Sequence, residues 1–318
     1  MQATPFHSGE RAIQERLGVR AQIEAFARQV VRPHMPEQHR EFYQNLPFLV
    51  AAARDSGGRP WATLLAGTPG FVSTPDARSL EIAARPVSGD ALADSFSPGA
   101  DVGLLGIEFA TRRRNRVNGR IVPTTQTGVR IAVDQSFGNC PQYIQTRSIE
   151  PRQFAVAQTA AGVERTETLT DEIVAFIEHA DTFFISSRTN RFSARASSGI
   201  DASHRGGRPG FVRAGADGVL SFPDFSGNRL FNTLGNIADD GRVGMLFADF
   251  DAGDLLLLTG RASIVWDGDR LDGFAGAQRL VDVKPAEFVL ARSALPLAGR
   301  LIEQSPKLAA TGTWQQGA

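Results

Sequence analysis

The N-terminal part of the chain carries hydrophobic residues at near-helical spacing. Their positions are Ile13, Leu17, Ile23, Phe26 and Val30. This spacing predicts one helix over residues 8–32, with Ser8 placed to cap its first turn. Pro33 and Pro36 end the pattern, and a short second helix is expected over residues 37–45.

After residue 45 the hydrophobic positions form short runs, separated by turns rich in Gly, Pro and Asp. The runs predicted as strands include residues 48–53, 61–65, 183–187, 247–250 and 255–259. Thr170 is placed to cap a helix with an acidic first turn, and a strand from Phe192 is expected after a turn over residues 188–191. Short strands with few helices predict a mainly β chain with flanking helices, whose antiparallel sheets close into barrels.

Four segments of the first half recur in the second half in the same order. The pairs are 69–72 with 209–212, 104–109 with 245–250, 117–120 with 258–261, and 144–148 with 289–293. The offset is 140 or 141 positions for the first three pairs and 145 for the fourth, so the repeating unit is as large as a domain. We therefore predict two tandem units, over residues 1–160 and 161–318.

Charge and cysteine content narrow the classes of function. The 318 residues include 34 Lys+Arg and 34 Asp+Glu, and a net charge of zero gives no reason to expect a nucleic acid or a membrane surface as partner. The single cysteine, Cys140, excludes an internal disulfide and a cysteine-based metal cluster, and His7, His34 and His39 have no metal-ligand partners at a convincing spacing. The N-terminus has no signal-peptide pattern and no apolar run reaches about 18 residues, so a cytoplasmic protein is expected.

One stretch of the second unit has the pattern of an anion site. Residues 220–237 read as a strand, a turn and a helix beginning near Gly227. The first turn of that helix would expose free N–H groups, with Asn228 and Arg229 beside them, and a guanidinium adds a charge-assisted contact to phosphate. The alternative is that Ser226 caps a surface helix and Arg229 is solvated, and the residues alone do not decide.

The same stretch resembles the pyridoxamine-5'-phosphate-oxidase family. In that family an aromatic-rich strand end precedes a Ser-Arg-Lys helix start that holds the phosphate of FMN. Residues 222–225 (FPDF), which begin with Phe222, resemble the strand end, and Gly227-Asn228-Arg229 falls where Ser-Arg-Lys would be. One hydroxyl and one cation of the family pattern are missing, and Ser226 and Arg229 would partly replace them. The resemblance implies FMN and a split β-barrel, with the first unit as a degenerate copy.

A second element of the resemblance lies at the opening hairpin of the second unit. The family has an arginine on the second hairpin strand that reaches the flavin phosphate, and residues 189–195 (TNRFSAR) place Arg195 there. Ser197 and Ser198 follow, and the resemblance implies that they face the ring or the ribityl chain. The alternative for Arg195 is a cross-strand pair at the surface.

Residues 201–207 (DASHRGG), together with 209–212 (PGFV), resemble a subgroup of uncharacterised flavin-nucleotide-binding proteins. The sequence suggests that His204 and Arg205 lie in a glycine-flanked insertion that reaches over the cofactor. They are the candidate catalytic residues on the substrate side, because a histidine there can donate a proton. The alternative is an ordinary polar loop tip.

The resemblance implies an FMN-binding oxidoreductase that acts on a small-molecule redox substrate or electron donor. Residues 280–318 lack the Arg-x-His motif of the vitamin B6 oxidases, so that activity is not expected. The alternatives are an electron-relay module without its own substrate and a haem-binding or haem-degrading split barrel. Because such barrels hold flavin at a dimer interface, either the duplicated chain mimics that dimer or two chains form a homodimer. The arginine-rich residues 112–116 are either a solvated turn or an anion contact made by the first unit.

Overall fold

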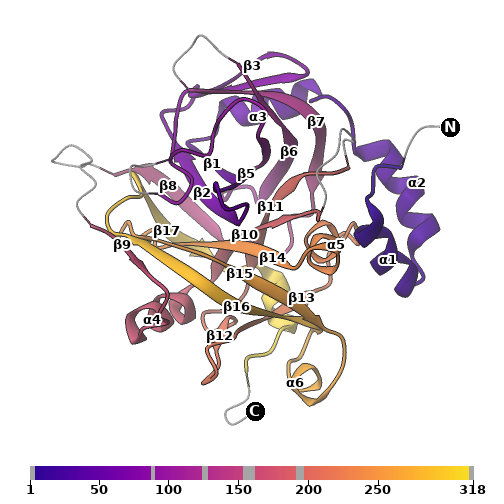
Figure 1. Ribbon diagram of the computed structural model, residues 1–318, viewed down its shortest axis with the longest axis vertical. Coiled ribbons are helices and arrows are strands. Elements are labelled where there is room, and N and C mark those ends of the chain that lie inside the picture. The colour runs from indigo at the N-terminus through magenta and orange to yellow at the C-terminus, as the bar shows by residue number, and fades with distance from the viewer. Residues whose placement is uncertain (1–3, 87–89, 124–127, 153–161, 191–196, 315–318) are drawn as a thin grey trace.

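The computed structural model describes residues 4–86, 90–123, 128–152, 162–190 and 197–314 (Figure 1). Two large antiparallel sheets dominate it, and a two-stranded sheet joins β8 (Thr146–Pro151) to β17 (Leu297–Glu303). The prediction of a mainly β chain with antiparallel sheets and flanking helices is confirmed. No helix within the described residues is long and apolar enough to span a membrane.

The helix predicted over residues 8–32 is in fact two helices. α1 spans Ser8–Arg16 and α2 spans Arg20–Val30. Gly18 lies between them with a φ of 67°, a left-handed conformation that ends a helix and that glycine adopts at little cost. The apolar spacing continues across this break, so periodicity alone could not locate it. α3 (Glu37–Gln44) confirms the second predicted helix.

The first sheet has the order β2-β1-β5-β6-β7-β4-β3. Its strands are β1 (Phe48–Arg54), β2 (Pro60–Ala66), β3 (Val72–Asp76), β4 (Ser79–Ile82), β5 (Asp101–Glu108), β6 (Arg113–Val122) and β7 (Val129–Asn139). Many of their apolar residues, among them Leu49, Leu104 and Ile131, are fully buried.

The second sheet has the order β11-β10-β14-β15-β16-β13-β12, which is the same arrangement shifted by nine strands. Its strands are β10 (Thr182–Arg188), β11 (Ile200–Gly206), β12 (Arg213–Ala214), β13 (Leu220–Phe225), β14 (Arg242–Ala248), β15 (Leu255–Val265) and β16 (Ala277–Ala291), and β9 (Val163–Thr166) pairs with β16. α4 (Asp171–His179) precedes β10 and is capped by Thr170 as predicted. α5 (Asn232–Asp239) joins β13 to β14, and the short α6 (Asp269–Asp272) precedes β16.

The repeat extends to individual residue pairs. Leu104 pairs with Val117, and Met245 pairs with Leu258 at the equivalent places. The ladders β6–β7 and β15–β16 each carry a bulge, after Asn118 and after Thr259 respectively. The first three sequence matches therefore occupy equivalent positions.

The fourth sequence match, by contrast, is wrong. Residues 146–148 lie in β8 of the small sheet, whereas residues 289–291 lie in β16, whose counterpart is β7. A short Arg-Ser match reflects composition rather than equivalent structure. The division at residues 160 and 161 remains a prediction, because residues 153–161 lie outside the described part of the chain.

The two halves pack together through β1, β2 and β5 of the first sheet and β10, β11 and β14 of the second (Figure 1). A Cβ on Gly103 of β5 would lie 2.5 Å from the carbonyl oxygen of Ile200, and a Cβ on Gly244 of β14 would lie 2.5 Å from that of Pro60. The two contacts are equivalent in the repeat, so the interface has an approximate two-fold relationship like that of a symmetric dimer. Phe184, among other second-half residues, belongs to the same hydrophobic core as the first sheet.

Candidate functional site

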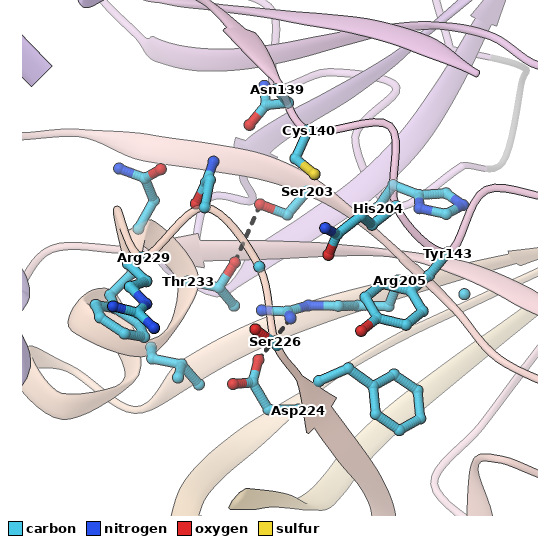
Figure 2. A pocket seen from close by; sticks show the side chains of 18 of the residues that line it. Asn139, Cys140, Tyr143, Ser203, His204, Arg205, Asp224, Ser226, Arg229 and Thr233 are labelled. Carbon is cyan, nitrogen blue, oxygen red and sulfur yellow. Dashed lines mark hydrogen bonds and ion pairs between the residues drawn. The ribbon is translucent and has the colours of Figure 1, made fainter. Parts of the chain in front are cut away.

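A pocket opens between the two halves at the end of β13 (Figure 2). The second half lines it with residues of β11, the segment that follows β13 and the start of α5. The first half lines it with residues of β6 and of the stretch that follows β7. The lining residues include Arg114, Arg116, Asn139, Tyr143, Ser203, His204, Arg205, Asp224, Phe225, Ser226, Gly227, Asn228, Arg229, Thr233 and Arg279.

Residues 201–206 form a strand, not the inserted loop that the sequence suggested. They lie in β11, where Asp201 pairs with Ser187 and Arg205 pairs with Phe183 of β10. Successive side chains of a strand point to opposite faces, so Ser203 and Arg205 share one face of β11, whereas the ring of His204, which also belongs to a lining residue, lies on the opposite face against Phe109 and Phe184. Asp201, Ser203 and Arg205 stand at alternate positions of the sequence, and this spacing could have indicated a strand with a polar face.

Asp224, at the end of β13, is buried and holds two arginines. Its carboxylate accepts a hydrogen bond of 2.6 Å from Nη1 of Arg205, and its other oxygen accepts one of 2.8 Å from Nη2 of Arg279. Figure 2 shows the first of these contacts as a dashed line between Arg205 and Asp224. One carboxylate between two guanidinium groups leaves a net positive charge at this point.

The first half adds Arg116, a buried residue of β6. Its Nη1 lies 3.3 Å from Oδ1 of Asp201, and its Nη2 donates to the hydroxyl of Ser203. Oδ2 of Asp201 accepts a hydrogen bond of 2.8 Å from Asn236 of α5, so the network links both halves and the helix. Thr233 joins it by donating to Ser203 at 3.0 Å.

Arg114, two positions earlier on β6, lies on the same side of the strand. Its Nε donates to the carbonyl oxygen of Cys140 at 2.7 Å, and its Nη1 lies 3.2 Å from Nδ1 of His204. Loss of contact with water, with smaller effects of the like charges on Arg116 and Arg205, lowers the pKa of Arg114 to about 10. The positive charges of Arg116 and Arg205 thus lie close enough to Arg114 to disfavour its protonated form.

His204 is buried between aromatic rings. Its imidazole makes edge contacts with Phe109 and Phe184, at centroid distances of 6.4 and 5.7 Å. Burial, and then the charge of Arg114, lowers its pKa well below the usual value, so the ring is neutral. Because Nδ1 accepts from Arg114, we assign the proton to Nε2, which has no partner among the described residues.

The segment between β13 and α5 differs from the sequence prediction in one respect. α5 begins at Asn232, not near Gly227, because Arg229 and Phe231 adopt left-handed conformations with φ of 60° and 63°. Asn228 stabilises this loop, since its Oδ1 accepts a hydrogen bond from the N–H of Leu230 at 3.1 Å. The side chain of Arg229 is exposed and lines the pocket, so the loop rather than the first turn of a helix presents it.

The structure does not bring all of the predicted cofactor-binding residues together. Ser226, Gly227, Asn228 and Arg229 line the pocket. The ring of Phe222 lies in the core of the second sheet, where it packs on Phe183 at a centroid distance of 4.9 Å.

Two other predicted residues, Ser197 and Ser198, line a separate cavity beside α1 and α2, together with Thr189 and Asn190. Arg195 and the strand expected from Phe192 lie outside the described residues. The predicted cofactor-binding residues that lie in the pocket are therefore the four of the loop after β13, residues 226–229.

Sequence reasoning also missed residues of the pocket. The arginine-rich residues 112–116 are not merely a solvated turn, because Arg114 and Arg116 occupy alternate positions of β6 and face the second half. Arg113, between them, donates to the carbonyl oxygen of Gln38 on the other side of the strand. The i, i+2 spacing was present in the sequence, but its meaning depended on recognising a strand.

The charge balance of the pocket is strongly positive. Among the described lining residues there are five arginines, at positions 114, 116, 205, 229 and 279, and one carboxylate, Asp224. Among the residues whose side chains face the pocket, the buried polar atoms that lack a partner are Nε of Arg116, Nδ2 of Asn139 and Nε of Arg205. All three are nitrogens that can donate, so the pocket is suited to an anionic, acceptor-rich ligand. No group of three or more metal-ligating side chains occurs in the described part of the chain.

Comparisons with known proteins give remote similarities. No protein-family model and no curated protein matches the chain. Crystal structures of HupZ from Group A Streptococcus and of a HupZ variant are similar over 40% and 39% of this chain, and 96% and 99% of theirs, at 13% identity and TM-scores of 0.31 and 0.30. A structure of the Bacillus subtilis inhibitor of motility MotI/DgrA aligns over 76% of this chain and 87% of its own, at 8% identity and a TM-score of 0.20.

Proposed function

We propose that the protein binds FMN through the arginine-lined pocket between its halves and acts as an FMN-dependent oxidoreductase of the pyridoxamine-5'-phosphate-oxidase-like type. The observation that carries this proposal is the excess of five guanidinium groups over one carboxylate in the pocket. A phosphate group would supply the missing negative charge and accept from the unpartnered donors on Arg116, Asn139 and Arg205.

Within this pocket Arg229 is the side chain best suited to hold the phosphate. It lines the pocket, and no carboxylate of the described residues lies within ion-pair distance of it. Arg205 and Arg279 already share Asp224, so they contribute less free charge. The hydroxyl of Ser226 and the loop N–H groups lie beside Arg229 in the chain and would add neutral donors.

An aromatic pair lines the same pocket. The rings of Tyr143, from the first half, and Phe225, from the second, stack at a centroid distance of 5.0 Å. A flat ring system packs well against such a surface. The cavity volume is about 120 Å³, which is room for a phosphate-sized group and not for a whole flavin, so the ring would project from it.

Bound FMN would supply the hydride or electron transfer, and the protein would bind and orient it. The substrate would be a small-molecule redox substrate or an electron donor. His204 is less suited to proton transfer than the sequence suggested, because its neutral ring lies between Phe109 and Phe184. Arg205 remains a candidate for a substrate contact.

The proposal is tested by the visible absorption of the purified protein and by titration of the ligand-free protein with FMN and riboflavin. We expect flavin bands, or uptake of FMN in preference to riboflavin, which lacks the phosphate. A protein that takes up neither flavin would overturn the proposal, and a Soret band would favour the haem alternative. Reduction of bound flavin by a donor, without turnover of any substrate, would favour the electron-relay alternative.

A further inference from the structure

The approximate two-fold relationship gives the pocket a counterpart on the other side of the interface. In the first sheet Leu105 of β5 pairs with Arg116 of β6, and at the equivalent place of the second sheet Leu246 of β14 pairs with Leu257 of β15. Leu257 therefore occupies the position of Arg116. Two residues earlier on each strand, Leu255 occupies the position of Arg114. The two pairs of positions differ by 141 residues.

The other wall of the counterpart is assigned in the same way. Leu49 pairs with Leu65 in β1–β2 where Phe183 pairs with Arg205 in β10–β11. Leu65 therefore stands at the position of Arg205, and Thr63 stands at the position of Ser203. The counterpart replaces three arginines by three leucines.

The counterpart position is closed by packing. Leu65, Leu255 and Leu257 are buried members of the core that the two halves share. The segment between β4 and β5 also contributes Leu92 and Phe96 to that core, whereas the matching segment after β13 lines the open pocket. A ligand cannot enter the counterpart position without displacing this core.

In the open, arginine-lined pocket, both halves contribute positively charged side chains. Arg114 and Arg116 reach the pocket from β6, while Arg205 and Arg229 reach it from the second half. Arg116 is held by Asp201, but its buried Nε has no partner among the described residues. The first half is thus part of the pocket and not only a scaffold beside it.

We infer that each chain takes one anionic ligand, in a composite site that requires Arg114 and Arg116 of the first half as well as the arginines of the second. The naming of FMN as that ligand rests on the proposed function. A symmetric dimer of one-unit chains would have two equivalent ligand sites at its interface. In this chain the two halves form one such site, and leucine side chains fill the position of the other.

The test is equilibrium dialysis of the full-length protein against FMN and, separately, against inorganic pyrophosphate, with the solution mass measured alongside. Arg114→Leu, which copies the residue of the counterpart position, is compared with wild type. The matched control is Arg113→Leu on the other face of β6, where the guanidinium lies on the ring of Phe42. Arg114 donates to neutral groups, so its removal leaves no carboxylate unpaired.

We expect one FMN per chain, about a tenfold or greater loss of affinity in Arg114→Leu, and no change in Arg113→Leu. Two ligands per chain, or equal affinities of Arg114→Leu and wild type, would overturn the inference. Pyrophosphate bound once per chain without any FMN binding would overturn the proposed function and leave the composite site standing. Binding of neither would overturn both.

Discussion

Nη1 of Arg116 on β6 lies 3.3 Å from Oδ1 of Asp201 on β11, and this ion pair joins the two halves of the chain beneath the pocket. Both residues are buried, and Asp201 also accepts hydrogen bonds from Asn118 and Asn236. A buried pair of this kind rarely adds much stability by itself, but it fixes which groups face each other. Here it holds a first-half guanidinium beside the arginines of the second half.

Arg229→Ala is expected to weaken FMN binding by about 1.5–3 kcal/mol, because the phosphate loses a charge-assisted partner. Riboflavin affinity should change much less, since riboflavin has no phosphate. Both affinities are measured by fluorescence titration. Arg120→Ala is the control, because Arg120 lies near Asp101 and Asp134 of the first sheet. Equal losses for FMN and riboflavin would show that Arg229 does not contact the phosphate.

Asp224→Ala is expected to lower the free energy of unfolding by about 3–5 kcal/mol, because it leaves Arg205 and Arg279 facing each other without a counter-charge. The measurement is urea denaturation. Asp282→Ala is the control, since the side chain of its partner Arg270 is 41% exposed, against 4% for Arg279, and partly exposed pairs contribute about 1 kcal/mol or less. Similar losses in both variants would contradict the special role of Asp224.

Gly103→Ala and Gly244→Ala are each expected to destabilise the protein by about 1–3 kcal/mol or more, because the new methyl group meets backbone of the other half. Gly138→Ala is the control, because the nearest atom to its new Cβ is Oδ1 of Asn115 at 3.4 Å. Thermal or urea unfolding compares the three variants. If either interface variant is as stable as the control, the close contact between the halves is not rigid.

Glu10 makes stability depend on pH. Burial, with a smaller effect of Asp201, raises the pKa of the Glu10 carboxyl to about 8. The folded state therefore holds a proton that the unfolded state has lost above about pH 4.5. The contribution of Glu10 to the free energy of unfolding is therefore fully present below about pH 4.5. It is lost as the pH rises towards 8, at up to about 1.4 kcal/mol per pH unit.

Glu10→Gln mimics the protonated carboxyl and should flatten the decline in stability between pH 5 and 8. Urea unfolding at several pH values in this window measures the effect. The position matters because Glu10 accepts hydrogen bonds from the N–H of His7, which caps α1 in place of the predicted Ser8, and from Asn232 at the start of α5. An unchanged pH profile in the variant would exclude Glu10 as the titrating group.

The sequence by itself determined several strands, the cap of α4 and three of the four matches between the halves. Strand runs, turn residues and the Thr170 cap are recorded in neighbouring residues, so periodicity and turn chemistry were enough to find them. The cationic loop containing Arg229 was also visible, because its residues are contiguous.

Only the tertiary structure decided how distant residues meet. Whether His204 or Arg205 faces the pocket depended on β11 being a strand with a fixed pairing to β10. The placement of Arg116 against Asp201, 85 positions apart, depended on how the two sheets pack, and the separation of Ser197 and Ser198 from Arg229 depended on the course of the chain between them. Such contacts are set by packing across the interface and leave no local pattern, so the composite character of the pocket emerged from the fold alone.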